Sequence, residues 1–286
     1  MKKIFLFSFL FCLTAVARQH GVIYGVDNRH ELYEVLDSKI IHLARSTVAI
    51  IPSELITVGN SGTAVVTTHK PKDNNICSDE KFANQGAAAD CTGYLVSSDI
   101  VVTAGHCIES IKECKNSRFV FDFGLYSPND TYYKIPIEKI FDCSQLLYTN
   151  NPELTKSGPD LAVIRLTNRV DRPPLQLERQ TTIHENDSIF ILGHPLGLPL
   201  KYAGEAEVIK VESKSTLRCN LDAYRGNSGS PVFNARSYRI EGMLLSGEDD
   251  FIEEKGKCSR SKICNPGDSC EGEEVLRVSE IIPYLP

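Results

Sequence analysis

The sequence lacks a long internal apolar run, a clustered basic face and any internal repeat. After the N-terminus, no stretch approaches the roughly 18 apolar residues that a membrane-spanning helix needs, so we expect no membrane partner. The formal charge of −6 is spread over mixed acidic and basic residues. That distribution argues against nucleic-acid binding, which needs a clustered basic surface. Long amphipathic helical patterns are also scarce, so the chain must build its core mainly from other elements.

The N-terminal residues resemble a targeting segment. A basic start at residues 1–3 is followed by an apolar stretch over residues 4–16 and by the small-x-small cleavage site Ala15-Val16-Ala17. We therefore expect a signal peptide over residues 1–17 and a short propeptide as an option over residues 18–21. The mature protein is expected to be extracytoplasmic, either secreted or periplasmic.

The chain has ten cysteines, and Cys12 lies in the expected signal peptide, which leaves nine. In an oxidising compartment these are first interpreted as disulfides, with one cysteine left over. Zinc is the alternative for Cys258, Cys264 and Cys270. Their spacing lacks a CxxC knuckle, and no histidine lies nearby in the sequence. We therefore expect no metal ion and no other cofactor.

Short apolar runs bounded by Gly, Pro, Asn, Asp or Ser dominate the chain, which is typical of an all-β sandwich or barrel. The runs lie at residues 63–67, 94–96, 100–102, 119–121, 161–164, 189–192 and 242–245. A proline-containing linker at 171–182 divides two strand-rich halves, 22–170 and 183–286. Residues 248–274 form an acidic, cysteine-bearing insertion, expected to be a stapled surface loop. The apolar spacing of 275–285 predicts a short C-terminal helix.

The most informative motif is Gly226-Asn227-Ser228-Gly229-Ser230-Pro231-Val232. A serine hydroxyl is a weak nucleophile, so it needs a base to take its proton and N–H donors to hold the developing oxyanion. The flanking glycines allow a tight turn that can direct the N–H groups of Gly226 and Ser228 into one pocket. An ordinary Gly-Ser loop is the alternative.

Two further segments could supply the base and its partner. His106, in Thr103-Ala104-Gly105-His106-Cys107, follows an apolar strand and is well placed to face a cleft. Asp160 begins the apolar run 161–166, where an acid can be buried against an imidazole and stabilise the imidazolium formed during attack. Each residue alone is ambiguous, because a single histidine is often structural and an acid before a strand is often a turn residue.

The three segments occur in the order His106, Asp160, Ser228, and together they resemble the chymotrypsin/trypsin-like serine peptidases. Within that family, residues 23–29 and 226–232 are most similar to the bacterial glutamyl-endopeptidase-like branch. The resemblance implies an all-β fold of two antiparallel β-barrels with the cleft between them. It also implies a serine endopeptidase that acts on polypeptide substrates, and we expect a monomer.

The resemblance assigns roles to individual residues. His106 is expected to deprotonate Ser228, Asp160 to orient His106, and the N–H groups of Gly226 and Ser228 to form the oxyanion hole. Cys91 and Cys107 look like the disulfide that this family places beside the catalytic histidine. The alternative function is an inactive homologue that binds peptides or regulates another protease. Such proteins usually lose a triad member, and here none is missing.

Substrate preference is predicted less directly. Residues Leu244, Leu245, Ser246 and Gly247 look like the substrate-binding strand of the family. Glutamyl endopeptidases are expected to carry a histidine where Leu244 stands, which argues against glutamate preference. Asp222 lies six positions before Ser228, where trypsin-like members place the acid that pairs with a Lys or Arg side chain. Alternatively, Asp222 serves its own loop and is neutralised by Arg225.

Two further residues, Asn227 and His194, lie beside the motifs of the resemblance. Asn227 stands where most animal members carry an acid that pairs with the new N-terminus after activation, so activation by this route is not expected here. His194, in Gly193-His194-Pro195, follows an apolar strand, and we expect it to be exposed in a turn.

Overall fold

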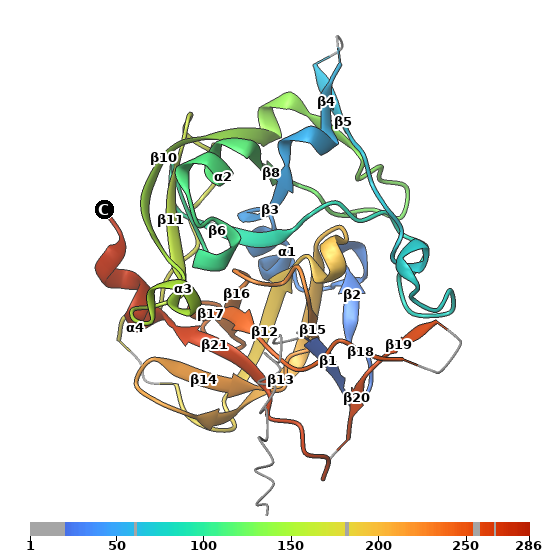
Figure 1. The fold of residues 1–286 in the computed structure, drawn as a ribbon, viewed down its shortest axis with the longest axis vertical. Helices are drawn as coiled ribbons and strands as arrows, with labels where there is room; N and C mark the ends of the chain where they lie inside the picture. Colours follow the sequence, from blue (N-terminus) through green and yellow to red (C-terminus); the bar gives the residue numbers. More distant parts are fainter. Residues whose placement is uncertain (1–20, 60–61, 181–182, 254–257, 266) are drawn as a thin grey trace, which may run out of the picture.

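A computed structural model describes residues 21–59, 62–180, 183–253, 258–265 and 267–286. The expected signal peptide and residues 18–20 lie outside this part of the chain. The described residues form two β-barrels, seen one above the other in Figure 1. Helices are few and short, as the scarcity of amphipathic patterns predicts, and the all-β fold class is confirmed.

The first barrel closes through six antiparallel strands in the order β10-β11-β7-β6-β3-β8. Side chains alternate across its wall. Val101 packs inside the barrel, whereas its neighbour Val102 belongs to the apolar cluster shared by the two halves. The strands are β3 Thr47–Pro52, β6 Cys91–Ser97, β7 Ile100–Thr103, β8 Ser117–Phe121, β10 Ile140–Asn150 and β11 Leu161–Leu166.

The second barrel runs in the order β12-β16-β17-β21-β14-β13 and closes because β12 also pairs with β13. Its core is mainly aliphatic, with Val208, Leu217 and Val232 fully buried. The strands are β12 Ser188–Gly193, β13 Lys201–Val211, β14 Thr216–Cys219, β16 Pro231–Asn234, β17 Ile240–Ser246 and β21 Glu273–Arg277.

The first strands of the chain pair with segments of the second half, whereas the sequence pattern groups residues 22–170 with the first barrel. Strand β1 (Gly21–Tyr24) pairs with β15 (Ala223–Tyr224) and with β20 (Ile263–Cys264), and β2 (Arg29–Glu31) extends the second sheet beside β13. Figure 1 shows β1 and β2 beside the lower half. Burial of the apolar side chains of β1 against the second half stabilises this arrangement.

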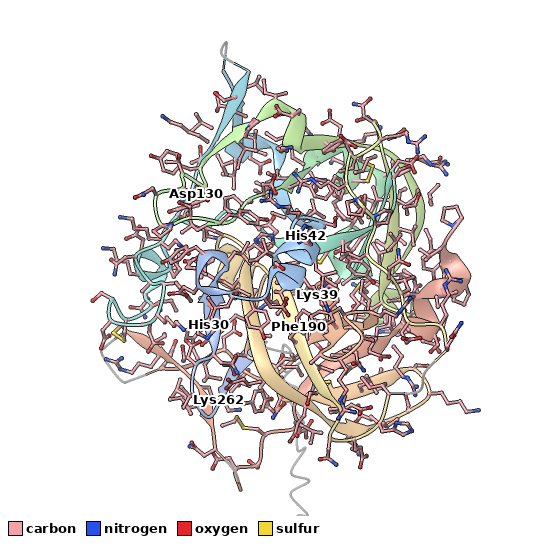
Figure 2. The ribbon with its side chains drawn as sticks, turned by 180° about the vertical axis from the view of Figure 1, so that it is seen from behind. His30, Lys39, His42, Asp130, Phe190 and Lys262 are labelled. Atoms are coloured by element: carbon pink, nitrogen blue, oxygen red, sulfur yellow. A yellow bond between two sulfur atoms is a disulfide. The ribbon has the colours of Figure 1, made fainter. Side chains whose placement is uncertain are left out.

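The remaining elements are short and lie around the barrels. Helix α1 begins after Asp37, whose carboxylate caps it by accepting from the Lys39 N–H, and Figure 2 shows Lys39 and His42 on this helix. The predicted C-terminal helix is confirmed as α4. The helices are α1 Ser38–Ala44, α2 Ile111–Asn116, α3 Pro152–Thr155 and α4 Val278–Ile281; the additional strands are β4 Ile56–Val58, β5 Thr63–Val66, β9 Lys134–Pro136, β18 Phe251–Glu253 and β19 Ser259–Ser261.

Single-turn 3₁₀ segments connect several of these elements. They are η1 Leu32–Glu34, η2 Ser53–Leu55, η3 Pro71–Asn74, η4 Gly105–Cys107, η5 Ile137–Lys139, η6 Pro195–Gly197 and η7 Ile282–Tyr284. Segment η4 carries the predicted catalytic histidine. Across the described ranges, none of the helices is long and apolar enough to span a bilayer.

One apolar cluster joins the two barrels and fixes the faces that meet between them. It includes Tyr94 and Leu161 from the first barrel and Phe190, Phe233 and Leu245 from the second. The rings of Phe190 and Phe233 stack with centroids 4.9 Å apart, and Phe190 is labelled in Figure 2. This packing fixes the position of one barrel relative to the other.

Four disulfides tie the loops. They join Cys77 to Cys258, Cys91 to Cys107, Cys114 to Cys143 and Cys264 to Cys270. The odd cysteine that the sequence leaves over is Cys219, which is buried and unpaired. Cys258, Cys264 and Cys270 are therefore disulfide partners, and the zinc alternative is wrong for them.

Candidate active site

His106 and Asp160 are held together by two hydrogen bonds. The ring Nδ1 of His106 lies 2.6 Å from Oδ2 of Asp160, and the backbone N–H of His106 donates to Oδ1 at 2.9 Å. The carboxylate thus binds both the side chain and the main chain of one residue. With Nδ1 carrying the shared proton, Nε2 is left as the free basic nitrogen of the ring.

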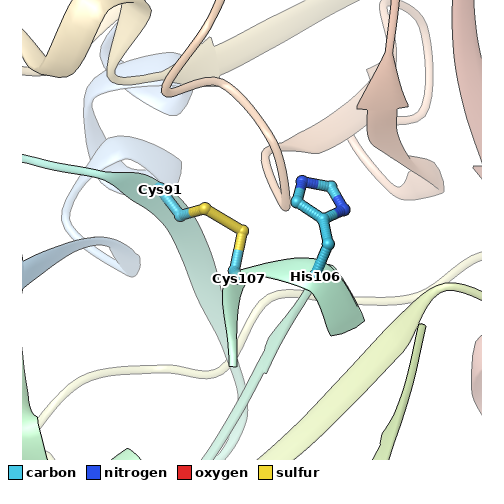
Figure 3. Close-up of side chains that lie close together, drawn as sticks. All are labelled: Cys91, His106 and Cys107. Carbon is cyan, nitrogen blue, oxygen red and sulfur yellow. A yellow bond between two sulfur atoms is a disulfide. The ribbon is translucent and has the colours of Figure 1, made fainter. Parts of the chain in front are cut away.

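Neighbouring strands of the first barrel create this pairing. His106 lies in η4 directly after β7, and Asp160 directly precedes β11, which pairs with β7. Gly105 allows the close approach, because a methyl group at this position would lie 1.9 Å from the carbonyl oxygen of Asn150. Figure 3 shows His106 beside the Cys91–Cys107 disulfide, which anchors η4 to β6.

The charge environment favours protonation of His106. Burial alone would lower the pKa of the imidazole. The hydrogen bond and the negative charge of Asp160, together with the charges of Glu153 and Glu109, outweigh burial and raise the pKa of His106 above its ordinary value. An imidazolium formed at this position is therefore stabilised.

The loop that carries Ser228 is a tight turn between β15 and β16. Gly226 and Gly229 adopt φ angles of +95° and +84°, which glycine reaches without strain. The loop docks on β6 of the first barrel, where Thr92 Oγ1 donates to the carbonyl of Gly226 at 2.9 Å and the Thr92 N–H donates to the carbonyl of Ser228 at 2.9 Å. Thr103 supports Thr92 by donating to its carbonyl.

The Ser228 side chain is largely buried, with 9% of the residue exposed. Its hydroxyl donates to the carbonyl oxygen of Leu245 at 3.2 Å. The same strand also receives the N–H of Gly229, which donates to the carbonyl of Leu244 at 2.8 Å. The serine loop is therefore fixed between β6 of the first barrel and β17 of the second.

A family model described as a trypsin-like peptidase domain matches residues 91–243 of the chain. The chain belongs to this family of serine-type endopeptidases. The matched range contains His106, Asp160 and Ser228. A comparison with curated protein sequences finds no match.

Solved structures with the same fold share little sequence with this trypsin-like chain. A serine endoprotease from Yersinia pestis has 13% identity and a TM-score of 0.51, covering 88% of this chain and 64% of its own. A Glu endopeptidase in complex with MPD has 15% identity and a TM-score of 0.52, with 92% and 98% coverage. Rv3671c from M. tuberculosis H37Rv, an inactive serine-to-alanine mutant, has 14% identity and a TM-score of 0.50, with 88% and 90% coverage. At these identities the likeness shows the fold alone.

The environment of Asp222 differs from that of a trypsin-like pocket acid. Its two oxygens accept the backbone N–H groups of Tyr24 and Asn28, each at 2.8 Å, and only 2% of the residue is exposed. Burial raises the pKa of this carboxyl to about 6, and the cation that opposes the shift is Arg29 rather than Arg225. The geometry therefore favours the alternative that Asp222 serves its own loop by holding the N-terminal segment.

The predicted substrate strand divides into buried and half-buried positions. Leu244 and Leu245 are buried, in the cores of the second barrel and of the barrel interface respectively. Ser246 and Gly247 are half-buried at the end of β17. The carbonyl of Leu245 accepts from Ser228, so the serine loop contacts β17 near its end, and Ser246 and Gly247 continue the chain beyond that contact.

The structure corrects the expectation for His194. Only 1% of this residue is exposed, because it packs at 5.7 Å from the Phe123 ring and lies under the serine loop. Its Nδ1 lies 2.9 Å from the carbonyl of Leu198, and its backbone N–H donates to Thr92 Oγ1. Burial lowers the pKa of His194 to about 3, so the ring is neutral and structural.

A cleft of about 780 Å³ adjoins the serine loop. Its walls come from the segments that connect the barrel strands in both halves of the chain, and they include Asp90, Arg225, Gly226, Asp250 and Phe251. The disulfide Cys77–Cys258 links the segments that contribute Ile76 and Ser259 to this lining. Within the described residues, one group of three potential metal ligands is drawn together, Cys91, His106 and Cys107, and its two cysteines are bonded to each other as a disulfide.

Sequence reasoning missed Thr92 and the two acids around the histidine. Thr92 is the residue by which the first barrel holds the serine loop, yet its only sequence signal is its place after Cys91. Glu153 acts on His106 through space from α3, and Glu109 does so from the loop after η4. Their proximity depends on the fold and leaves no spacing pattern in the chain.

Proposed function

We propose that the protein is an exported serine endopeptidase that cleaves polypeptides through an acyl-enzyme. His106, Asp160 and Ser228 are its catalytic triad. The observation that carries the proposal is the double hydrogen bond from His106 to Asp160. It lies beside a serine loop that both barrels hold in place, because Sγ of Cys107, the next residue after His106, lies 3.8 Å from the carbonyl oxygen of Ser228. The four disulfides support an oxidising, extracytoplasmic compartment.

The first half of the reaction forms the acyl-enzyme. Nε2 of His106 takes the hydroxyl proton of Ser228 while Oγ bonds to the carbonyl carbon of the substrate. The proton now donated to Leu245 is the one transferred, so that hydrogen bond is exchanged during attack. The N–H groups of Gly226 and Ser228 hold the oxyanion. His106 then gives the proton to the leaving nitrogen as the C–N bond breaks.

The second half releases the product. His106 takes a proton from a water molecule, whose oxygen attacks the ester carbon, and returns that proton to Oγ as the C–O bond to Ser228 breaks. Asp160 keeps Nδ1 protonated throughout and stabilises the imidazolium that forms twice in each cycle. The raised pKa of His106 supports this role for the pair.

A serine-directed fluorophosphonate tests the assignment. The mature protein is expected to be labelled at Ser228, as read by mass spectrometry of its peptides, and to hydrolyse an unfolded protein substrate. Ser228→Ala should lose both properties. Ser230→Ala is the matched control, because Ser230 lies two residues away and is fully buried, and it should still be labelled at Ser228. A Ser228→Ala variant with undiminished hydrolysis would overturn the triad. A folded, unlabelled wild type would favour the inactive peptide-binding homologue.

A further inference from the structure

Glu273 lies directly behind the predicted substrate strand. It begins β21, which pairs with β17 so that Ser246 stands opposite Glu274. Only 1% of Glu273 is exposed. A methyl group placed on Gly247 would lie 1.7 Å from Oε2 of this carboxylate. The absence of a side chain at Gly247 is therefore what gives the carboxylate its place beside the strand.

The Glu273 carboxylate is not neutralised by the protein. Its Oε1 has no hydrogen-bond partner among the described residues. Arg218 is the cation whose charge acts on it, but Arg218 already binds Glu212 and Glu274 at 2.8 and 2.9 Å. Burial and the nearby charge of Asp250 raise the pKa of Glu273 well above its ordinary value. The site holds an acid and lacks a cation.

The charged and polar groups around Glu273 do not supply the missing cation either. Lys262 is used by Glu248, which it contacts at 2.7 Å. The buried hydroxyl of Tyr24 also has no hydrogen-bond partner among the described residues, and burial together with the charge of Glu273 raises its pKa. The carboxylate of Glu273 accepts one backbone hydrogen bond, from Glu248, but its buried Oε1 has none, which is costly, so a cation that reaches this oxygen gains much of the lost interaction. The acids do not converge as metal ligands do, since no group of three containing Glu273 lies within 4.8 Å in the described chain.

The position of Glu273 relative to the reactive serine indicates which substrate group could reach it. Ser228 Oγ contacts the carbonyl of Leu245, and Gly247 lies two residues further along. Two residues of extended chain span about 7 Å, which a long side chain can cross. The substrate side chain closest to the attacked carbonyl belongs to the residue immediately before the cleaved bond. A Lys or Arg at that position matches both the distance and the charge.

We propose that Glu273 is the specificity-determining residue of this enzyme and that it selects a Lys or Arg side chain immediately before the cleaved bond. This inference rests on the proposed function of Ser228. It differs from the sequence expectation for Asp222, whose two oxygens already bind backbone N–H groups. Glu273 has the free oxygen that Asp222 lacks.

Two peptide substrates that differ only in charge test the proposal. Each carries a fluorogenic leaving group, one after arginine and the other after citrulline, which keeps the shape of arginine and removes its charge. A charge-assisted hydrogen bond corresponds to roughly a 10- to 150-fold preference in kcat/KM for arginine. Glu273→Gln should bring the arginine-to-citrulline ratio of kcat/KM close to one, chiefly by lowering kcat/KM for the arginine substrate.

Glu274→Gln is the matched control, because Glu274 is the next residue of β21 and its carboxylate is used by Arg218. This variant should keep the arginine preference. An unchanged preference in Glu273→Gln, or no preference in wild type, would overturn the proposal. Thermal denaturation of both variants shows whether they are folded. Glu273→Gln should fold, because a neutral Gln is easier to bury than an ionised Glu.

A binding measurement separates this inference from the proposed function. Product peptides that end in arginine or citrulline are titrated into Ser228→Ala, with and without Glu273→Gln. If wild type hydrolyses neither substrate but Ser228→Ala prefers the arginine peptide in a Glu273-dependent way, the specificity site stands and the proposed function fails. If both substrates are hydrolysed at equal rates and no binding preference appears, the triad stands and the specificity site fails.

Discussion

Replacing Asp160 by Asn perturbs the histidine pair with the least change in shape. The carboxylate accepts two N–H groups of His106, from the backbone at 2.9 Å and from the ring at 2.6 Å. An amide has one oxygen, so it can accept only one of them. If that oxygen keeps the backbone N–H, the amide NH₂ faces Nδ1 and donates to it. The ring proton then moves to Nε2, which can no longer take the proton of Ser228.

The expected cost follows from this change of tautomer. A Ser-His-Asp site with the wrong tautomer loses about 10⁴ in kcat. At about 1.36 kcal/mol for each factor of ten, the barrier rises by about 5.5 kcal/mol. KM should change little, because Asp160 touches the histidine and not the peptide. Steady-state kinetics on a fluorogenic peptide measure both constants.

The pH profile provides a second readout of the same variant. In wild type, kcat/KM should rise with pH through the pKa of His106, because the base must be neutral to accept a proton. The pKa of His106 is raised mainly by the hydrogen bond and charge of Asp160, which outweigh the opposing effect of burial. In Asp160→Asn that support is lost and burial remains, so the inflection should move to lower pH.

Glu153→Gln is the control for charge without the hydrogen bond, since Glu153 raises the pKa of His106 through space. It should lower the inflection slightly and leave kcat close to wild type, because the tautomer is unchanged. An Asp160→Asn enzyme that kept more than about a tenth of wild-type kcat would refute the reasoning. So would a Glu153→Gln enzyme that lost as much activity as Asp160→Asn.

Two further variants test the supporting structure. Asp222→Ala removes the acceptor of the Tyr24 and Asn28 N–H groups, and each charge-assisted bond contributes about 1.5–3 kcal/mol. Urea denaturation should therefore show that the free energy of unfolding falls by about 3 kcal/mol or more. An altered arginine preference in this variant would instead support a pocket role for Asp222. Gly105→Ala places a methyl group 1.9 Å from the carbonyl oxygen of Asn150. Urea denaturation should show that the free energy of unfolding falls by about 1–3 kcal/mol, and kcat should fall by a larger factor than KM changes. An unaltered kcat would contradict the close packing.

The fold was predictable because its main signal is local. Runs such as 100–102 and 161–164 are short, apolar and bounded by turn residues, and each became a strand of the first barrel. The pairing of β1 and β2 with the second half was not predictable in this way. Tyr24 and Cys264 are partners across 240 positions, and no periodicity in either segment records that contact.

The residues of the candidate site also fall into two groups, those that a local motif predicts and those that only the folded chain brings together. Ser228 and His106 lie in motifs whose glycines are explained by close contacts in the structure, so their sequence neighbourhoods were informative. Spacing placed Asp222 near the substrate but could not reveal that backbone N–H groups occupy both of its oxygens. Glu273 was missed because it lies near the end of the acidic stretch 248–274, which resembles a solvated loop. Its burial depends on the pairing of β21 with β17.

The Cys77–Cys258 disulfide has a consequence for the fate of a cut chain. The bond closes a covalent ring across a sequence separation of 181, and this ring contains His106, Asp160 and Ser228. If one molecule nicks another anywhere within that ring, both fragments stay attached through sulfur. Such a nicked molecule would run as one species on a non-reducing gel and as two after reduction. Apparent intactness without reductant is therefore no measure of how far a preparation has digested itself.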